Sequence, residues 1–228
     1  MKNSMIIIKK QLKDTLKNKT ILIQFILFPI MTLIMENAIQ LEGMPEHFFT
    51  KLFSIMYIGM APLTSVASII SEEKEKNTLR VLLMANIKPW QYLLGIGIYV
   101  WSICMIGAGV MATGLPKQEI AIYLLIMAIG FVVSILAGAC IGIYAKNQMS
   151  ATSLVMPLMM VLSFLPMLAM FNEKIEKIAN FFFTQQLKLC LNDMSLAGHL
   201  KETYIVLGVN VIITLLIFGI TFKKKGLE

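Results

Sequence analysis

The chain has 228 residues, of which 57% are hydrophobic and 14% are charged, and its mean hydropathy is +0.77. Soluble domains carry about 25% charged residues, so a soluble fold of this size could not bury so much apolar surface, and the composition predicts an integral membrane protein. The net charge of +7 bears first on membrane topology, because Lys and Arg set helix orientation, and basic residues scattered over several loops argue against a nucleic-acid partner.

The first segment, residues 1–19, has the pattern of an amphipathic helix. Met5, Ile8, Leu12 and Leu16 recur at helical spacing, with lysines on the other side. Such a helix lies in the membrane interface, where Lys stems extend towards anionic lipid headgroups. The alternative is a positively charged N-terminus that only fixes the topology.

Six segments are apolar and long enough to cross about 30 Å of hydrocarbon, which takes roughly 20 residues. None of them contains Lys, Arg, Asp or His, and no alternating pattern of barrel strands occurs. We therefore predict a single all-α transmembrane domain over residues 1–228. The predicted spans are 20–40, 52–71, 90–113, 120–145, 151–171 and 203–222.

The distribution of basic residues predicts the orientation of these spans. If the N-terminus lies inside, fourteen Lys and Arg residues face the cytoplasm and six face the outer side. This asymmetry predicts a multi-pass protein of the plasma membrane with both termini in the cytoplasm.

The second half of the chain carries two packing predictions. Gly138 and Gly142 form a GxxxG sequence in the fourth span, a spacing that lets helices approach closely. Segment 172–202 is too polar to cross a membrane and too apolar for a free loop. Its helical spacing predicts one or two short helices that lie on the outer face or dip into it.

No motif of a catalytic or nucleotide-binding site occurs in the chain. The two histidines, His47 and His199, fall in predicted outer loops, and HExxH, GxSxG and GxxxxGK[ST] are all absent. The three cysteines lack the CxxC spacing of a zinc site. Apart from Glu36, close to the end of the first span, the spans lack the ionisable groups of proton relays. We therefore expect no enzyme activity, metal or cofactor in this chain, so energy for uphill transport would enter through a partner.

The longest charge-rich run, Ser71–Gln91, is the candidate surface for such a partner. Its acidic residues come first, an apolar stripe of leucines follows, and Pro89 ends the helical pattern. We predict an amphipathic coupling helix over residues 72–88; the alternative is a solvated loop whose lysines only enforce topology. The candidate contact residues are Glu72, Glu73, Lys74, Glu75, Lys76, Thr78, Leu79, Leu82 and Leu83.

The sequence SEEKEKNTLRVLLMANIKPWQYLLGI resembles the signature loop of permease subunits of ABC-2 type exporters. Members of that family typically have Glu-Arg-Glu-x-Gly-Thr-Leu before a leucine-rich helix. Lys74 replaces the usual Arg, which keeps the charge but loses the bidentate fork, and Asn77 replaces the usual Gly but still tolerates unusual backbone angles. The residues that fit the pattern are Glu73, Lys74, Glu75, Thr78 and Leu79.

The resemblance extends to the layout of the whole chain. It implies two permease chains, identical or different, each docked on an ATPase subunit that holds ATP and Mg²⁺. The charged side chains of the coupling helix would contact the ATPase, and its leucines would anchor the helix. The uncharged spans favour an amphipathic or hydrophobic cargo such as a peptide, a toxin or a lipid, and exporters of bacteriocins and cytolytic peptides have this compact size. The alternatives are a non-transporting scaffold or immunity protein that binds a partner or toxin, and, with less support, an intramembrane enzyme.

Overall fold

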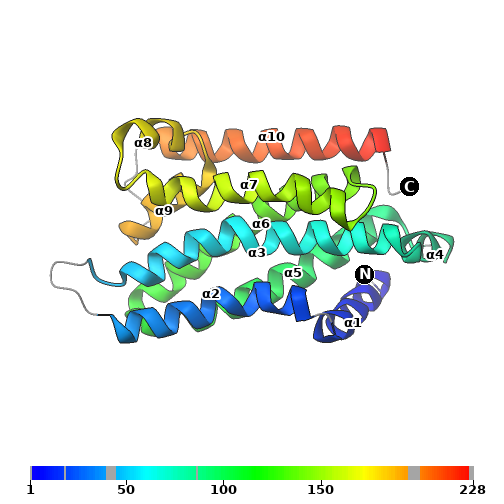
Figure 1. Cartoon of the computed structure of the whole chain (residues 1–228), viewed down its shortest axis with the longest axis horizontal. Coiled ribbons are helices and arrows are strands. Elements are labelled where there is room, and N and C mark those ends of the chain that lie inside the picture. The colour runs from blue at the N-terminus through cyan, green and yellow to red at the C-terminus, as the bar shows by residue number, and fades with distance from the viewer. Residues whose placement is uncertain (1, 18, 40–44, 86, 195–200, 226–228) are drawn as a thin grey trace.

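In the computed structural model the chain forms a bundle of α-helices (Figure 1). The structure describes residues 2–17, 19–39, 45–85, 87–194 and 201–225, and none of these lies in a β-strand. Six helices are long and apolar enough to cross a membrane, which confirms the predicted all-α membrane fold. These helices are α2 (Lys19–Ala38), α3 (Phe48–Glu75), α5 (Pro89–Met111), α6 (Lys117–Tyr144), α7 (Gln148–Leu168) and α10 (Lys201–Lys225).

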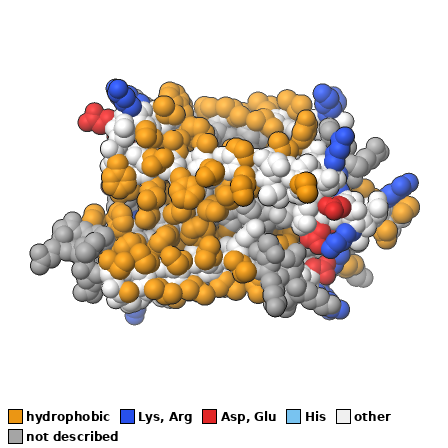
Figure 2. All heavy atoms as spheres, viewed as in Figure 1, with side chains coloured by type: hydrophobic (Ala, Val, Ile, Leu, Met, Phe, Trp, Pro, Cys, Tyr) orange, Lys and Arg blue, Asp and Glu red, His pale blue; other side chains and the backbone are white. Residues whose placement is uncertain are grey.

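Shorter helices lie at the two ends of the bundle. One end, here called the α4 end, carries α1 (Lys2–Lys17), α4 (Thr78–Met84) and the last turn of α10; the other, the α9 end, carries α8 (Glu173–Ala179) and α9 (Phe183–Asn192) (Figure 1). On the face drawn in Figure 2, hydrophobic side chains cover the middle of the bundle, and charged side chains gather at its ends. This distribution matches the apolar band that a bilayer requires.

Helix α3 is the central element of the bundle, because α2, α5, α6, α7 and α9 all pack against it. One close approach is to α6, through the two glycines of the GxxxG sequence. A Cβ atom at Gly138 would lie 2.5 Å from the carbonyl oxygen of Leu63, and one at Gly142 would lie 2.8 Å from Cβ of Ile70. Any larger side chain at Gly138 would therefore force the two backbones apart.

Segment 172–202 contributes two short helices, and residues 195–200 of it lie outside the described part of the chain. Helix α9 inserts among α3, α6, α7 and α10, and most of its side chains are buried, including Leu187 and Leu191. Its insertion closes the bundle at the α9 end.

Candidate functional site: the charged end of α3

The predicted coupling helix over residues 72–88 is divided in the structure. Glu72–Glu75 form the last turn of α3, and Thr78–Met84 form the separate helix α4. Asn77 separates them with φ 55° and ψ 11°, in the left-handed region, which Asn tolerates better than most side chains. Pro89 is the first residue of α5, a position that suits Pro because no helical N–H bond is lost there.

Glu73 fastens the end of α3 to α1. Its side chain is only 8% exposed, and it accepts hydrogen bonds from Nζ of Lys10 and, at 2.5 Å, from Nε2 of Gln11. A carboxylate buried to this degree is stable in its charged form only where it is paired and hydrogen-bonded. The sequence predicts that Glu73 contacts a partner subunit, but in the structure its side chain is bonded to two residues of its own chain.

The next two residues fasten the same turn of α3 to α6 and α7. Nζ of Lys74 donates to the carbonyl oxygen of Ile143 at 2.7 Å, close to the C-terminus of α6. Glu75 Oε2 accepts from the backbone N–H of Gln148, the first residue of α7, at 2.9 Å. The positive charge of Lys74 lies at the C-terminus of α6 and the negative charge of Glu75 at the N-terminus of α7. Both placements are favourable, because a helix C-terminus favours a cation and an N-terminus favours an anion. One turn of α3 therefore connects to three other helices.

Glu72 and Lys76 lie on the outer side of this turn. They form an ion pair one turn apart, as their spacing predicts, and the Lys76 side chain is 63% exposed. The hydrogen bond and the charge of Glu72 raise the pKa of Lys76. Beside them a groove of about 610 Å³ runs between α1 and α3, lined by polar and charged side chains of both helices. This groove and the exposed pair form the accessible part of the charged end.

Helix α4 packs its leucines against the protein itself. Leu79 is 1% exposed, and Leu82 and Leu83 are half-buried against the same core. The opposite side of α4 is open, since Val81 is 59% and Met84 is 70% exposed. The predicted leucine anchor therefore holds α4 onto the bundle, and a different set of α4 side chains is available to a partner.

Three groups in this site were missed by sequence reasoning. Lys10 and Gln11 lie on the polar side of an amphipathic pattern. Their partner, Glu73, is 63 and 62 residues away in the sequence, and helical periodicity does not predict contacts at that separation. The N–H of Gln148 that Glu75 caps belongs to the backbone, so no side-chain pattern could reveal it. An unpaired N-terminal N–H at the start of a predicted helix is the one signal that could have suggested a cap.

The described residues contain no group of three or more His, Cys, Asp or Glu side chains that could hold a metal ion. His47 precedes α3 with φ 56°, and its Nδ1 lies 3.6 Å from Oε1 of Glu36. Glu36 also accepts from the backbone N–H of Thr50 at 3.0 Å, so this group secures the first turn of α3. His199 lies outside the described residues.

Comparison with known proteins gives one family for the chain. The family described as "ABC-2 family transporter protein" matches residues 1–223. The match covers every described helix except the last residues of α10. No curated protein matches the chain.

Proposed function

The chain belongs to the ABC-2 family of transporter proteins, and from this premise we propose that it is the permease subunit of an exporter powered by a separate ATPase. The permease role follows from the family and from the six apolar helices. The ATPase, a second permease chain, the plasma membrane and the cytoplasmic position of the α4 end are parts of the proposal. Positive charge supports this orientation, because most of the Lys and Arg residues fall in the segments at the α4 end.

The observation that carries the proposal is the connection of one charged turn of α3 to three other helices. Glu73, Lys74 and Glu75 belong to α3 and bond to α1, α6 and α7 respectively. A displacement of α4 would be transmitted to all of them at once, because α4 follows this turn after only two residues. This is an arrangement through which an ATPase could move several helices of the bundle together.

The contact surface that we propose for the ATPase is the exposed side of α4 with the adjoining ion pair. Met84 and Val81 offer an apolar centre, and Arg80, Glu72 and Lys76 supply a charged rim. Interfaces between subunits commonly combine an apolar core with a polar rim. Glu73 and Leu79 then support the surface from within, instead of contacting the partner themselves. ATP and Mg²⁺ are expected in the ATPase subunit.

For the cargo we propose an amphipathic or hydrophobic molecule such as a peptide, a toxin or a lipid. The six spans carry ionisable side chains only where they approach the bundle ends, so their middle offers no charged groups to compensate for a desolvated ion. A hydrophilic sugar chain as the exported molecule, with peptide resistance unaffected by loss of this chain, would contradict the assignment.

Co-purification tests the proposed function. The tagged full-length chain, extracted in a mild detergent, should bring down an ATP-binding-cassette ATPase in equimolar amount, together with a second permease chain that is either identical or different. The double substitution Val81→Asp and Met84→Asp should lower the recovered ATPase by about tenfold, because charge is introduced into an apolar contact centre. The matched control Ile178→Asp and Phe181→Asp changes exposed residues at the α9 end, outside the membrane-spanning helices, and should leave recovery unchanged. Recovery of a toxin with no ATPase would favour the immunity or scaffold alternative.

A further inference from the structure

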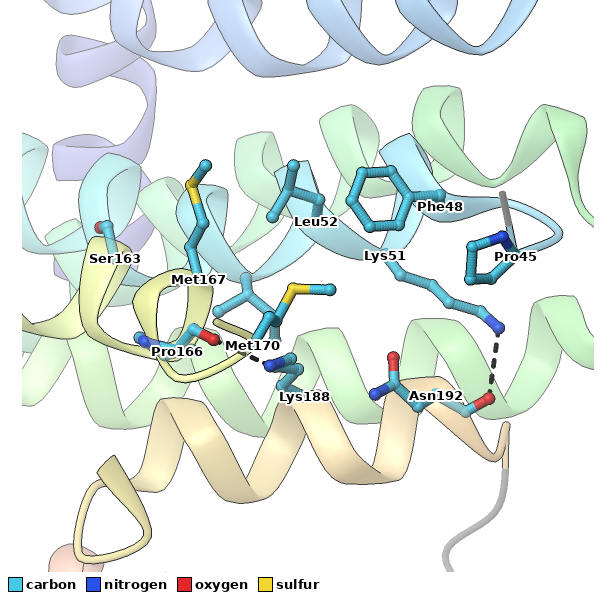
Figure 3. Close-up of a pocket in the computed structure, with 11 residues that line it drawn as sticks. Pro45, Phe48, Lys51, Leu52, Ser163, Pro166, Met167, Met170, Lys188 and Asn192 are labelled. Atoms are coloured by element: carbon cyan, nitrogen blue, oxygen red, sulfur yellow. Dashed lines mark hydrogen bonds between the residues drawn. The ribbon is translucent and has the colours of Figure 1, made fainter. Parts of the chain in front are cut away.

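A small cavity at the α9 end combines an apolar lining with two lysines. It has a volume of about 190 Å³ and lies between α3, α7 and α9 (Figure 3). Phe48, Leu52 and Met170 supply apolar surface. The side chains of Lys51 and Lys188 also line the cavity, and their ammonium groups are directed to Asn192 and to Pro166, respectively (Figure 3). Apolar walls with a few polar groups are typical of a binding site for a small ligand.

Both ammonium groups have hydrogen-bonding capacity left over. Nζ of Lys51 donates to the carbonyl oxygen of Asn192 at 3.2 Å, and Nζ of Lys188 donates to that of Pro166 at 2.8 Å. Each ammonium carries three N–H donors, and neither lysine forms a salt bridge within the described part of the chain. Both half-buried cations are hydrogen-bonded to neutral carbonyl groups, and neither is in direct contact with a carboxylate of the described residues, so an anion would stabilise them.

The shift in the pKa of Lys188 is consistent with an anion-binding cavity. Burial lowers the pKa of Lys188, while the charge of Glu176 acts in the opposite direction. A bound anion would favour the charged form and raise the pKa again. The cavity is therefore better suited to an anionic ligand than to a neutral or cationic one.

The depth of the cavity identifies the kind of anion. Phe48 is the first residue of α3, and Pro166 lies in the last turn of α7, so the cavity opens where the apolar spans meet the polar boundary of the bilayer. At this depth a phospholipid presents its phosphate, glycerol and first methylene groups, and basic pockets between membrane helices bind such headgroups. A free anion has no apolar part to fill the lining of the cavity, whereas a phospholipid has both parts.

We propose that this cavity binds an anionic phospholipid. Its phosphate would draw the flexible ammonium groups of Lys51 and Lys188 away from their carbonyl partners, and the glycerol and first methylene groups would lie against Phe48, Leu52 and Met170. The volume admits this part of the lipid, and the acyl chains remain in the bilayer. The lipid would bridge α3, α7 and α9. This site is distinct from the charged end of α3 and does not depend on the proposed transport function.

Native mass spectrometry of the full chain in neutral detergent tests the site. After delipidation, the protein is titrated with phosphatidylglycerol and with phosphatidylcholine of the same acyl chains. We expect one phosphatidylglycerol to be retained about tenfold better than phosphatidylcholine, which is the scale of two charge-assisted contacts. The double substitution K51Q/K188Q should reduce retention to the phosphatidylcholine level, and K51R/K188R should restore most of it.

The control K117Q/K174Q removes two exposed lysines of the same end of the bundle and should leave lipid retention unchanged. If K51Q/K188Q does not fold, K51Q alone should still lower retention about threefold. Equal retention of both lipids, or of phosphatidylglycerol by wild type and K51Q/K188Q, would overturn the proposal. Displacement of the lipid by millimolar inorganic phosphate, or lysine-dependent binding of an amphipathic peptide with no lipid preference, would also reject the phospholipid as the ligand.

Discussion

Replacing Glu73 and Glu75 together with Ala should strongly reduce coupling while the chain still inserts into the membrane. The change removes the buried acceptor of Lys10 and Gln11 and the carboxylate that caps α7. Breaking a fully buried ion pair costs about 3–5 kcal/mol, and less is expected here because Lys10 is 32% exposed. Coupling free energies between sites are about 1–3 kcal/mol. Their loss should lower both export and the stimulation of ATP hydrolysis by about tenfold or more, measured in vesicles that contain the complete transporter.

The control for this experiment is Glu173→Ala. Glu173 is exposed in the first turn of α8, at the α9 end of the bundle, and an exposed carboxylate near a helix N-terminus contributes only about 0.3–1 kcal/mol, so export should stay within about twofold of wild type. Membrane content of each variant is checked by quantitative blotting. If E73A/E75A exports its cargo as well as E173A does, the connection between the charged turn and α1 and α7 is not part of the coupling route.

Replacing Gly138 with Ala should strongly destabilise the whole bundle. The new Cβ would lie 2.5 Å from the carbonyl oxygen of Leu63, and this neighbour is backbone, so it cannot move aside by changing a rotamer. Overpacking of this kind costs about 1–3 kcal/mol or more. Because α3 is the helix on which most others pack, we expect a clearly lower unfolding midpoint in detergent and reduced amounts of the chain in the membrane.

Gly109→Ala is the matched control for Gly138→Ala. Gly109 is also within a membrane helix, but a Cβ atom there would meet no atom within 4 Å. Both substitutions gain the same helix propensity of about 1 kcal/mol, so the difference between their unfolding midpoints isolates the contact with Leu63. Equal midpoints for the two variants would show that α3 and α6 do not approach as closely as the structure has them.

The sequence predicts the helical membrane fold well because several long apolar segments all indicate the same fold. Six long apolar runs leave few other ways to satisfy backbone hydrogen bonds in hydrocarbon. The bounds are less predictable where charge and helix coexist. Helix α3 continues to Glu75, four residues beyond the predicted end at residue 71, because its last charged turn finds partners on three helices. A prediction from hydropathy places the end of a span at the first charged residues. The helix itself continues for as long as its residues find hydrogen-bond partners.

The candidate site is predictable in position but not in the direction of its side chains. The pattern around Glu73 and Leu79 locates a charged segment with a leucine stripe. An amphipathic pattern cannot state whether its apolar side packs on its own chain or on another. In the structure Leu79 is buried against the bundle and Met84 is exposed, so the open side of α4 does not carry the leucines that the pattern suggested as an anchor. The left-handed Asn77 is the exception, because its tolerance of that conformation is a local property of the residue.

Site-directed cross-linking tests the central proposal most directly. Met84→Cys places a thiol on the open side of α4, and Phe181→Cys places one at the α9 end, where Phe181 is 75% exposed. The three native cysteines are buried, so background labelling should be low. In membranes that contain the complete transporter, M84C should cross-link to the ATPase subunit, and F181C should not. A cross-link to the ATPase from F181C, or none from M84C in a complex that co-purifies with the ATPase, would contradict the proposal that work enters through α4.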